Sequence, residues 1–261
     1  MPSLSSLLPL QRQYRREGFS VAKRYLTLEM LKDVRLAVEE YYSVENAVLS
    51  DDIRSHGADC QRLNYDLRQA PDAVLAIAQH PLLLQLVKVM SGWSEAYLYD
   101  YYLFRKPPGA PQTPWHRDGD YLPINGELCT TWIPLESYDE ALYYALGTNR
   151  LSPEDSFCES SDDLSRLLES PSVRVLRVGA MQCGDVDVHN HRVWHMGPGN
   201  PTSNFRQAIA FTYVPSGCRV QLNPPGFNPV SGLSQRRSHV DAYFSGQDEL
   251  DLVGHHLIRV F

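Results

Sequence analysis

Hydrophobic and polar positions follow a helical period in the first third of the chain. The apolar residues Leu31, Val34 and Val38 recur every three to four positions behind Thr27, a residue type that caps helix N-termini well. This spacing predicts that residues 1–95 form a mostly helical region. Two more helical stretches are expected there, at residues 71–80 and 82–90.

From residue 96 onward the period changes to two, which is typical of strands. Turns rich in Gly and Pro separate these runs, and this pattern favours a sandwich or a barrel. We therefore predict a mainly β fold with its N-terminal helices packed on one sheet. Strands are expected at residues 97–102, 128–135, 173–178, 185–189 and 206–214, and a short inserted helix at residues 160–170.

The chain shows no internal repeat and no clear linker, so we interpret residues 1–261 as a single domain. In this interpretation residues 1–95 support a β core at residues 96–216. Residues 217–261 are rich in Pro and Gly and would wrap the core or form a lid.

Composition and charge narrow the classes of partner. Hydrophobic residues make up 43% of the chain and charged residues 21%, which is ordinary for a globular protein. The formal net charge of −7 disfavours nucleic acid and anionic lipid as partners. No apolar run approaches the length of a membrane span. The five cysteines are widely spaced, which predicts reduced thiols and a cytoplasmic location.

One short motif suggests a metal site. His116 and Asp118 stand two residues apart, and along a strand such residues point to the same side. Two histidines and one carboxylate form the facial ligand set of non-haem Fe(II) oxygenases. The third ligand would come from His189, His191 or His195, which lie close together further along the chain.

We choose His195 because of the residues that follow it. A Gly/Pro loop comes next, and Arg206 then opens an apolar strand. A hairpin built in this way would place His195 and Arg206 on neighbouring strands. An arginine there can hold a carboxylate in bidentate fashion. 2-Oxoglutarate has the matching shape, with a keto-acid end for iron and a distal carboxylate for Arg206.

These residues are part of a wider resemblance that covers most of the chain. The sequence resembles the phytanoyl-CoA dioxygenase-like family of Fe(II)/2-oxoglutarate-dependent oxygenases. The matching segments are Tyr14–Phe19, Lys106–Gly109, Trp115–Asp118, Trp132, Leu146–Asn149, Gly184–Val186, His195 and Arg206. Two departures are that Asn149 replaces a histidine and that Gly197 stands where many members have a hydroxyl.

The resemblance implies a double-stranded β-helix, which is a jelly-roll or cupin-like core. It implies that His116, Asp118 and His195 bind Fe(II), and that Arg206 binds the cosubstrate 2-oxoglutarate. Thr130 and Trp132 share a strand face and would line the 2-oxoglutarate pocket. The implied reaction consumes O₂ and releases succinate and CO₂. The carboxylate of Asp118 favours oxygenation over halogenation.

The expected substrate is a small organic molecule, such as one from specialised metabolism. Hydroxylation is the predicted outcome, with desaturation, epoxidation and ring closure as alternatives. The oligomeric state is left open. Candidates for the substrate pocket are Tyr99, Tyr101, Arg117, Asp120 and Tyr121.

Two other classes of protein use the same residues. One is a non-catalytic barrel that binds a carboxylate-bearing ligand and has a structural or vacant metal site. The other is a zinc hydrolase in which the metal activates a water molecule. The presence of all three candidate ligands together with Arg206 favours the oxygenase.

Overall fold

The computed structural model describes residues 2–45, 60–64, 67, 70–120, 126–152, 155–156, 158, 160–218 and 257–261. Its elements in chain order are α1 (Leu4–Glu17), β1 (Phe19–Ala22), α2 (Leu28–Glu45), β2 (Cys60–Asn64), α4 (Asp72–Ala78), α5 (Pro81–Ser91), β3 (Ala96–Lys106), β4 (Thr113–His116), the 3-10 turn η2 (Asp118–Asp120), β5 (Cys129–Pro134), β6 (Tyr143–Leu146), the 3-10 turn η3 (Thr148–Arg150), α6 (Ser161–Glu169), β7 (Arg174–Arg177), β8 (Val186–Asn190), β9 (Trp194–Gly197), β10 (Arg206–Pro215) and β11 (Ile258–Arg259).

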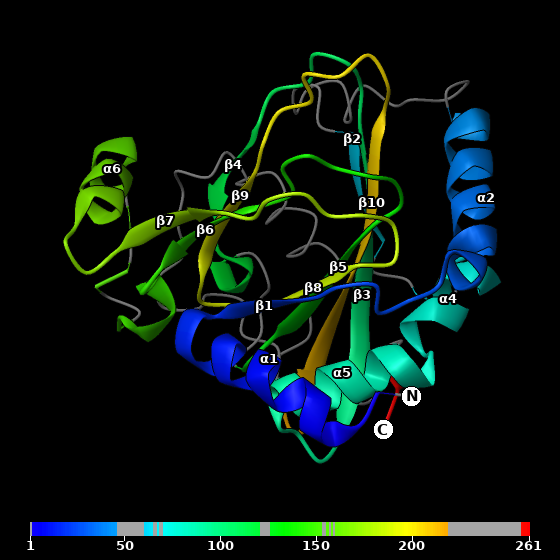
Figure 1. Ribbon diagram of the computed structural model, residues 1–261, viewed down its shortest axis with the longest axis horizontal. Coiled ribbons are helices and arrows are strands. Elements are labelled where there is room, and N and C mark those ends of the chain that lie inside the picture. The colour runs from blue at the N-terminus through cyan, green and yellow to red at the C-terminus, as the bar shows by residue number, and fades with distance from the viewer. Residues whose placement is uncertain are drawn as a thin grey trace, which may run out of the picture.

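Two antiparallel sheets form the core. The larger sheet has seven strands in the order β1-β8-β5-β10-β3-β11, with β2 also pairing with β3. The smaller sheet has four strands in the order β4-β9-β6-β7. The two sheets stand side by side in Figure 1, with α6 beyond the edge of the smaller one. This arrangement is the predicted double-stranded β-helix.

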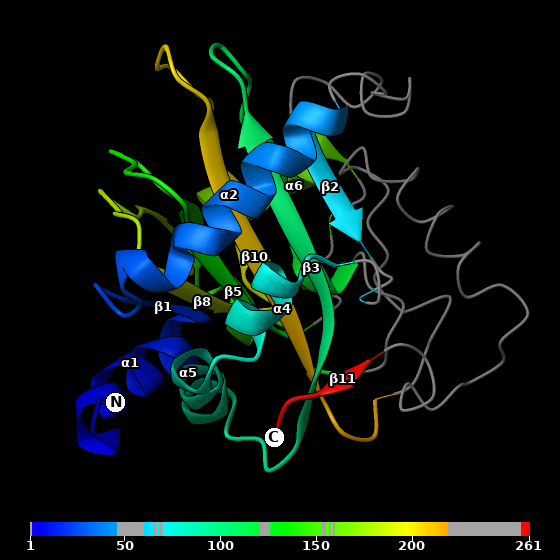
Figure 2. The ribbon, with the colours of Figure 1, turned by 90° about the vertical axis from the view of Figure 1, so that its right-hand side faces the viewer.

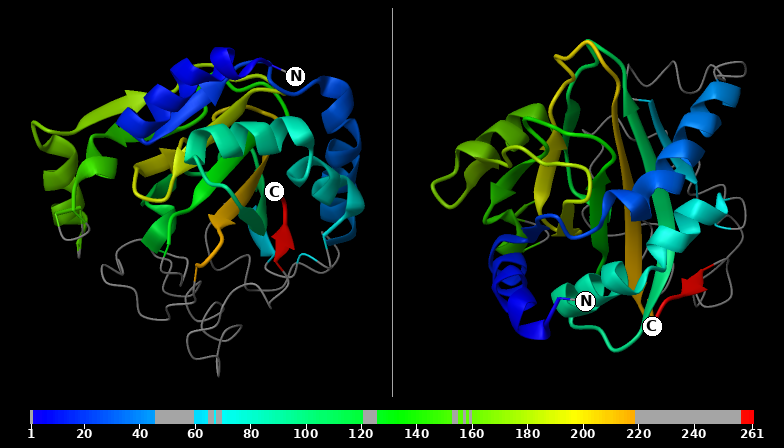
Figure 3. Two further views of the ribbon diagram at one scale, coloured as in Figure 1. Left: turned by 90° about the horizontal axis from the view of Figure 1, so that it is seen from below. Right: turned by 45° about the vertical axis from the view of Figure 1, so that its right-hand side comes forward.

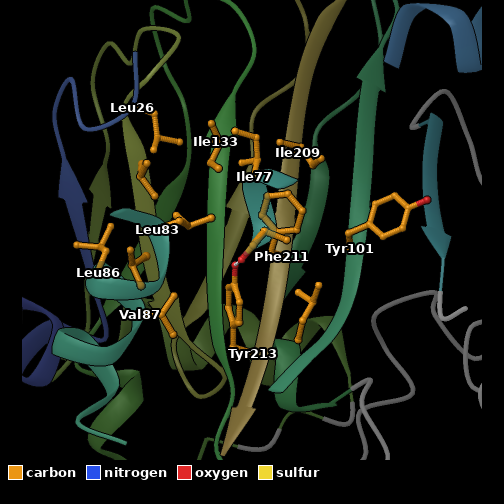
Figure 4. Close-up of a cluster of buried hydrophobic side chains, with 14 of the residues drawn as sticks. Leu26, Ile77, Leu83, Leu86, Val87, Tyr101, Ile133, Ile209, Phe211 and Tyr213 are labelled. Atoms are coloured by element: carbon orange, nitrogen blue, oxygen red, sulfur yellow. Dashed lines mark hydrogen bonds between the residues drawn. The ribbon is translucent and has the colours of Figure 1, made fainter. Parts of the chain in front are cut away.

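The helices α1, α2, α4 and α5 cover the outer face of the larger sheet (Figure 2). Between these helices and the sheet lies the main hydrophobic core. Ile77 of α4 lies there beside Phe211 of β10, and Leu86 of α5 belongs to the same cluster (Figure 4). Burying each such side chain stabilises the fold by about 1.5–3 kcal/mol. The helices therefore hold the larger sheet from behind and leave its inner face to the cavity.

The boundaries of the N-terminal helices follow the signals in the sequence. The Thr27 hydroxyl accepts a hydrogen bond from the backbone N–H of Met30, so α2 begins where predicted. Helix α5 has Pro81 in its first turn and ends at Gly92, whose φ of 77° is left-handed. Two strands also lie in this region and were not predicted. Both are short, and both join the larger sheet: β1 pairs with β8, and β2 pairs with β3.

The predicted strands of the β core are present as β3, β5, β7, β8 and β10, and the predicted inserted helix is α6. Figure 3 shows α6 and the smaller sheet on the side of the molecule away from α2. Strand β6 was not predicted, and β4 and β9 were expected only as the strands that carry His116 and His195, without bounds; all three belong to the smaller sheet. Each has only four residues, too few to show a clear period of two.

Most of the predicted C-terminal wrap or lid lies outside the described residues. Its last part is described, and there β11 pairs with β3 of the larger sheet. The interpretation of the chain as a single domain stays a prediction. Among the described residues no single helix has the length and apolar character to cross a bilayer; α4 and α5 reach that length and composition only as a pair, bent by 44°.

Candidate active site

The inner faces of the two sheets enclose a cavity. Strands β3, β5, β8 and β10 of the larger sheet contribute one wall, and β4 and β9 of the smaller sheet contribute the other. Aromatic side chains and charged side chains both face this space. The lining residues that carry the argument below are Tyr102, Phe104, Lys106, His116, Asp118, Thr130, Trp132, His189, His195 and Arg206.

Three of the predicted residues meet on one side of this cavity. One ligand atom each from His116, Asp118 and His195 lies within 4.8 Å of the others. The Oδ1 atom of Asp118 is 3.6 Å from Nε2 of His195 and 3.9 Å from Nε2 of His116. Two imidazoles and one carboxylate converging in this way can hold a divalent metal ion on one face, with the opposite coordination positions open.

Different local structures place these three side chains. His116 and His195 are direct partners in the pairing of β4 with β9, and their rings lie 4.2 Å apart between centroids. Asp118 is not on a strand. It opens the turn η2 just after β4 has ended. The predicted pair therefore shares one site because the chain turns sharply there, and the expectation of alternation along a strand was wrong.

Backbone carbonyls fix the orientation of both imidazoles. Nδ1 of His116 is 2.7 Å from the carbonyl oxygen of Pro114, and Nδ1 of His195 is 3.1 Å from that of Val193. A nitrogen in such a position donates its proton to the carbonyl. Nε2 then carries the lone pair that faces the site, which is the common arrangement for metal-binding histidines.

The charges at the site suit a cation. Burial raises the pKa of Asp118, but the imidazoles of His195, His189 and His116 outweigh it and hold that pKa far below its ordinary value. Burial, with the neighbouring His116 and His189, lowers the pKa of His195 well below its usual range. The site therefore offers an ionised carboxylate beside a neutral imidazole at neutral pH.

Arg206 lies across the same cavity, at the start of β10. Its Nη atoms donate to the carbonyl oxygens of Gly199 at 2.7 Å and Glu140 at 2.6 Å. Its Nε atom is buried and has no hydrogen-bond partner among the described residues. His195 and Arg206 were expected on neighbouring strands, and this was wrong. They belong to different sheets and line the same cavity from opposite walls.

Lys106 is a site residue that the sequence prediction did not include. It is directly opposite Arg206 in the pairing of β3 with β10, it is 8% exposed, and it lines the cavity. Its Nζ atom donates to the carbonyl oxygen of Pro198 at 3.1 Å. A Cβ atom built on Gly197 would lie 3.7 Å from this Nζ and 3.2 Å from the hydroxyl of Thr113. The neighbourhood of Gly197 thus contains an ammonium group and a hydroxyl despite the missing side chain.

His189 is the second residue that the prediction did not place in the site. It was considered as a metal ligand and set aside, but its ring lines the cavity, with Nε2 3.3 Å from Oδ2 of Asp118. His191, the third candidate, points elsewhere: its Nδ1 accepts the backbone N–H of Leu128. A Cβ on Gly119 would come within 3.0 Å of the His191 ring, so His191 packs against the turn that follows Asp118.

Strand β5 presents Thr130 and Trp132 to the cavity, as expected from their shared face. The expectation for β3 was wrong by one position. Tyr102 and Phe104 line the cavity, whereas Tyr101 packs in the core on the helix side. A shift of one residue along a strand exchanges its two faces.

Two further candidates for the substrate pocket, Arg117 and Tyr99, do not line the described cavity. Arg117 is buried, donates to the hydroxyl of Ser156 and stacks over the ring of Trp194 at 5.4 Å. Tyr99 is buried on the same strand as Tyr101. Tyr121 and the side chain of Asp120 lie outside the described residues.

Comparison with known families gives a match over most of the chain. A family model described as phytanoyl-CoA dioxygenase (PhyH) matches residues 14–208. No curated protein matches the sequence.

Solved structures share the fold at low identity. The non-heme alpha-ketoglutarate-dependent carbocyclase SnoK from nogalamycin biosynthesis has a TM-score of 0.75 and 20% identity, over 100% of this chain and 99% of that chain. The epimerase SnoN, in complex with Fe³⁺, alpha-ketoglutarate and nogalamycin RO, has a TM-score of 0.70 and 17% identity, over 99% and 100%. EvdO2 from Micromonospora carbonacea var. aurantiaca, complexed with 2-oxoglutarate, has a TM-score of 0.60 and 16% identity, over 83% and 94%.

Proposed function

The chain belongs to the phytanoyl-CoA dioxygenase (PhyH) family of Fe(II)/2-oxoglutarate-dependent oxygenases, and we propose that it hydroxylates a small organic molecule. The observation that carries the proposal is the meeting of His116, Asp118 and His195 in a cavity that Arg206 also lines. When iron, 2-oxoglutarate and O₂ are bound, they supply the oxidation, coupled to loss of CO₂ from 2-oxoglutarate and formation of succinate.

In this proposal His116, Asp118 and His195 are the iron ligands. Their donor set fits Fe(II), because it combines two imidazole nitrogens with one carboxylate oxygen and leaves one side of the site open to the cavity. The carbonyls of Pro114 and Val193 hold the two rings in place before a metal arrives. The protein therefore loses little side-chain freedom when the ion binds.

Arg206 and Lys106 would bind the distal carboxylate of 2-oxoglutarate. Two cations on paired strands face one cavity, so a carboxylate bound there would be attracted to both. The Nε atom of Arg206 offers a buried donor for a carboxylate oxygen. Lys106 and Thr113 would supply the contact that a hydroxyl at position 197 makes in other members of the family. Thr130 and Trp132 would complete the walls of this pocket.

The substrate class follows from the rest of the lining and from the structural neighbours. Tyr102 and Phe104 give the cavity apolar walls, which suit an organic molecule better than a strongly charged one. SnoK is a carbocyclase and SnoN an epimerase, both from nogalamycin biosynthesis. Ring closure and epimerisation are therefore alternatives to hydroxylation, together with desaturation and epoxidation.

A cytoplasmic location completes the proposal. Among the cysteines whose side chains are described, Cys129, Cys158, Cys183 and Cys218, none forms a disulfide. Such thiols fit a reducing compartment.

The direct test measures succinate formation by the purified protein with Fe(II), 2-oxoglutarate and O₂, across a panel of small organic molecules. Mass analysis of the product separates a gained oxygen from two lost hydrogens and from an unchanged mass. His116→Ala and His195→Ala should reduce succinate formation to background. Binding of 2-oxoglutarate without any turnover would favour the non-catalytic barrel, and hydrolysis with zinc in the absence of O₂ would favour the hydrolase.

A further inference from the structure

The two oxygens of the Asp118 carboxylate face different partners. Oδ1 faces the two candidate ligand rings, at 3.6 Å from His195 and 3.9 Å from His116. Oδ2 accepts a hydrogen bond from the hydroxyl of Thr130 at 2.6 Å and lies 3.3 Å from Nε2 of His189. One oxygen is therefore directed toward the metal site, and the other is held by the protein.

His189 is itself held tightly from its far side. The residue is 2% exposed, and its Nδ1 lies 2.8 Å from Oδ1 of Asp187, which is fully buried. The hydroxyl of Tyr144 donates to the same oxygen at 2.6 Å. Tyr144 belongs to β6 of the smaller sheet and stacks on Phe19 of β1 at 4.1 Å between ring centroids. Elements of both sheets thus fix the position of this imidazole.

We propose that His189 is a positioning residue for Asp118: together with Thr130 it occupies Oδ2, so that the carboxylate binds the metal through Oδ1 alone. This inference rests on the proposed function, in which Asp118 is an iron ligand. A carboxylate bound through both oxygens would take an additional coordination position. With Oδ2 held, three positions stay open, which is enough for the keto-acid end of 2-oxoglutarate and for O₂.

Two substitutions at position 189 test the contacts of the two ring nitrogens separately. The amide of His189→Gln can reach the place of Nε2 and donate to Asp118. The amide of His189→Asn can reach the place of Nδ1, so it keeps the contact with Asp187 and loses the contact with Asp118. Loss of a hydrogen bond that orients a metal ligand commonly weakens metal binding by about 10- to 100-fold.

The experiment is an anaerobic calorimetric titration of the whole protein with Fe(II), followed by addition of 2-oxoglutarate and recording of the visible charge-transfer band. We expect His189→Asn to bind Fe(II) at least about 10-fold more weakly and with an altered band. We expect His189→Gln to stay close to wild type. His80→Asn is the matched control, because it removes an imidazole at the N-cap of α5, away from the site.

Other outcomes overturn the inference. It is wrong if both variants bind Fe(II) as the wild type does, or if Gln weakens binding while Asn does not. If both variants bind weakly, Thr130→Val decides, because it removes only the other hydrogen bond to Oδ2: weakened binding supports the inference, and wild-type binding overturns it. The wild-type protein tests the proposed function separately. If it does not bind Fe(II), both the function and this inference fail.

Discussion

At the scale of single residues, Arg206 and Lys106 bring two positive charges to the lining of the cavity. Arg206 can present its buried Nε atom to a carboxylate while its Nη atoms remain on the carbonyls of Gly199 and Glu140. Lys106 lies directly opposite on β3 and lines the same cavity. In the proposed binding of 2-oxoglutarate the two cations would therefore have unequal roles: Arg206 would provide geometry as well as charge, and Lys106 would provide charge.

Arg206→Ala should weaken 2-oxoglutarate binding strongly. Truncating one partner of a buried charge pair costs about 2–5 kcal/mol, which is a rise in KM of roughly 30-fold or more. The KM of Arg206→Lys should lie between those of the wild type and Arg206→Ala, since lysine keeps the charge but lacks the paired donors of the guanidinium group. The measurement is succinate formation against 2-oxoglutarate concentration, with the melting temperature as a check on folding. An unchanged KM in Arg206→Ala would remove Arg206 from the cosubstrate site.

His191 gives a residue-scale prediction about pH. Burial lowers its pKa from the ordinary 6.5 to about 4, and its Nδ1 accepts the backbone N–H of Leu128. Between pH 4 and pH 6.5 the unfolded chain therefore binds a proton at His191 and the folded protein does not. The contribution to stability is therefore complete above pH 6.5 and is lost as the pH falls toward 4, on the order of 3 kcal/mol in all.

The check compares urea unfolding of the wild type with that of His191→Asn, whose side-chain oxygen can still accept from Leu128. The difference in free energy of unfolding between the two should shrink as the pH is lowered from 7 to 4. The pKa of His189 is raised to about 9 by its hydrogen bonds to Asp118 and Asp187, which outweigh burial, and this effect is common to both proteins. A difference that does not change with pH would contradict the lowered pKa of His191.

At the scale of elements, Gly184 and Asp185 connect the N-terminal segment to the start of β8. The carbonyl oxygen of Gly184 accepts the N–H groups of Tyr25 and Leu26 at 2.8 and 2.9 Å. The carboxylate of Asp185 accepts the N–H of Arg24 at 2.7 Å. This pair was noticed in the sequence as a family resemblance. In the structure it sets the path between β1 and α2, and so the position of the edge strand beside His189.

Gly184→Ala should therefore destabilise the protein. Gly184 has a φ of 96°, and a Cβ there would lie 2.3 Å from the carbonyl oxygen of Leu26. Backbone strain of this kind costs about 1–3 kcal/mol, so the melting temperature should fall by roughly 3–10 °C. Gly179→Ala is the matched control, because a Cβ there meets nothing within 4 Å and should change stability by less than about 0.5 kcal/mol. Equal melting temperatures for the two variants would contradict the prediction.

The elements also show where sequence reasoning succeeds. Helix α5 and strand β5 could be predicted because each has a clear period and clear ends, at Gly92 for the helix and at the turns for the strand. Strand β1 could not, because its four residues carry no period and its partner, β8, lies far along the chain. Short strands defined by distant partners leave no local signal.

The candidate site also has features that could be predicted from the sequence and features that could not. Its residue types were predictable from spacing and resemblance, but its geometry depends on which sheet each strand joins. Residues 198–205 form a loop long enough to carry the chain from β9 in the smaller sheet to β10 in the larger one, so His195 and Arg206 face each other across a cavity. His189 was set aside for a related reason. Its partners Asp118 and Tyr144 come from other elements and cannot be recognised from the residues around it.

At the scale of the whole molecule, the site joins the two sheets. His116 and His195 come from the smaller sheet, and Arg206 and Lys106 from the larger sheet. In the proposed site the metal would be held by the smaller sheet and the turn after β4, and 2-oxoglutarate would extend from the metal to the larger sheet. Both ligands should stabilise the folded protein, because the unfolded chain cannot assemble the site. Fe(II) at about 100 times its Kd would add roughly 2.7 kcal/mol, which corresponds to a rise in melting temperature of about 5–10 °C.

Anaerobic thermal unfolding can measure the stabilisation by Fe(II) and by 2-oxoglutarate separately. In the wild type, Fe(II) should raise the melting temperature, and 2-oxoglutarate should raise it further. Arg206→Ala should keep the rise due to Fe(II) and lose most of the rise due to 2-oxoglutarate, because its three metal-binding side chains are intact. His195→Ala should lose both, since the keto-acid end of 2-oxoglutarate needs the metal. If His195→Ala kept the rise with Fe(II), the metal would have to be bound by another set of residues, and His189 beside Asp118 would be the first to examine.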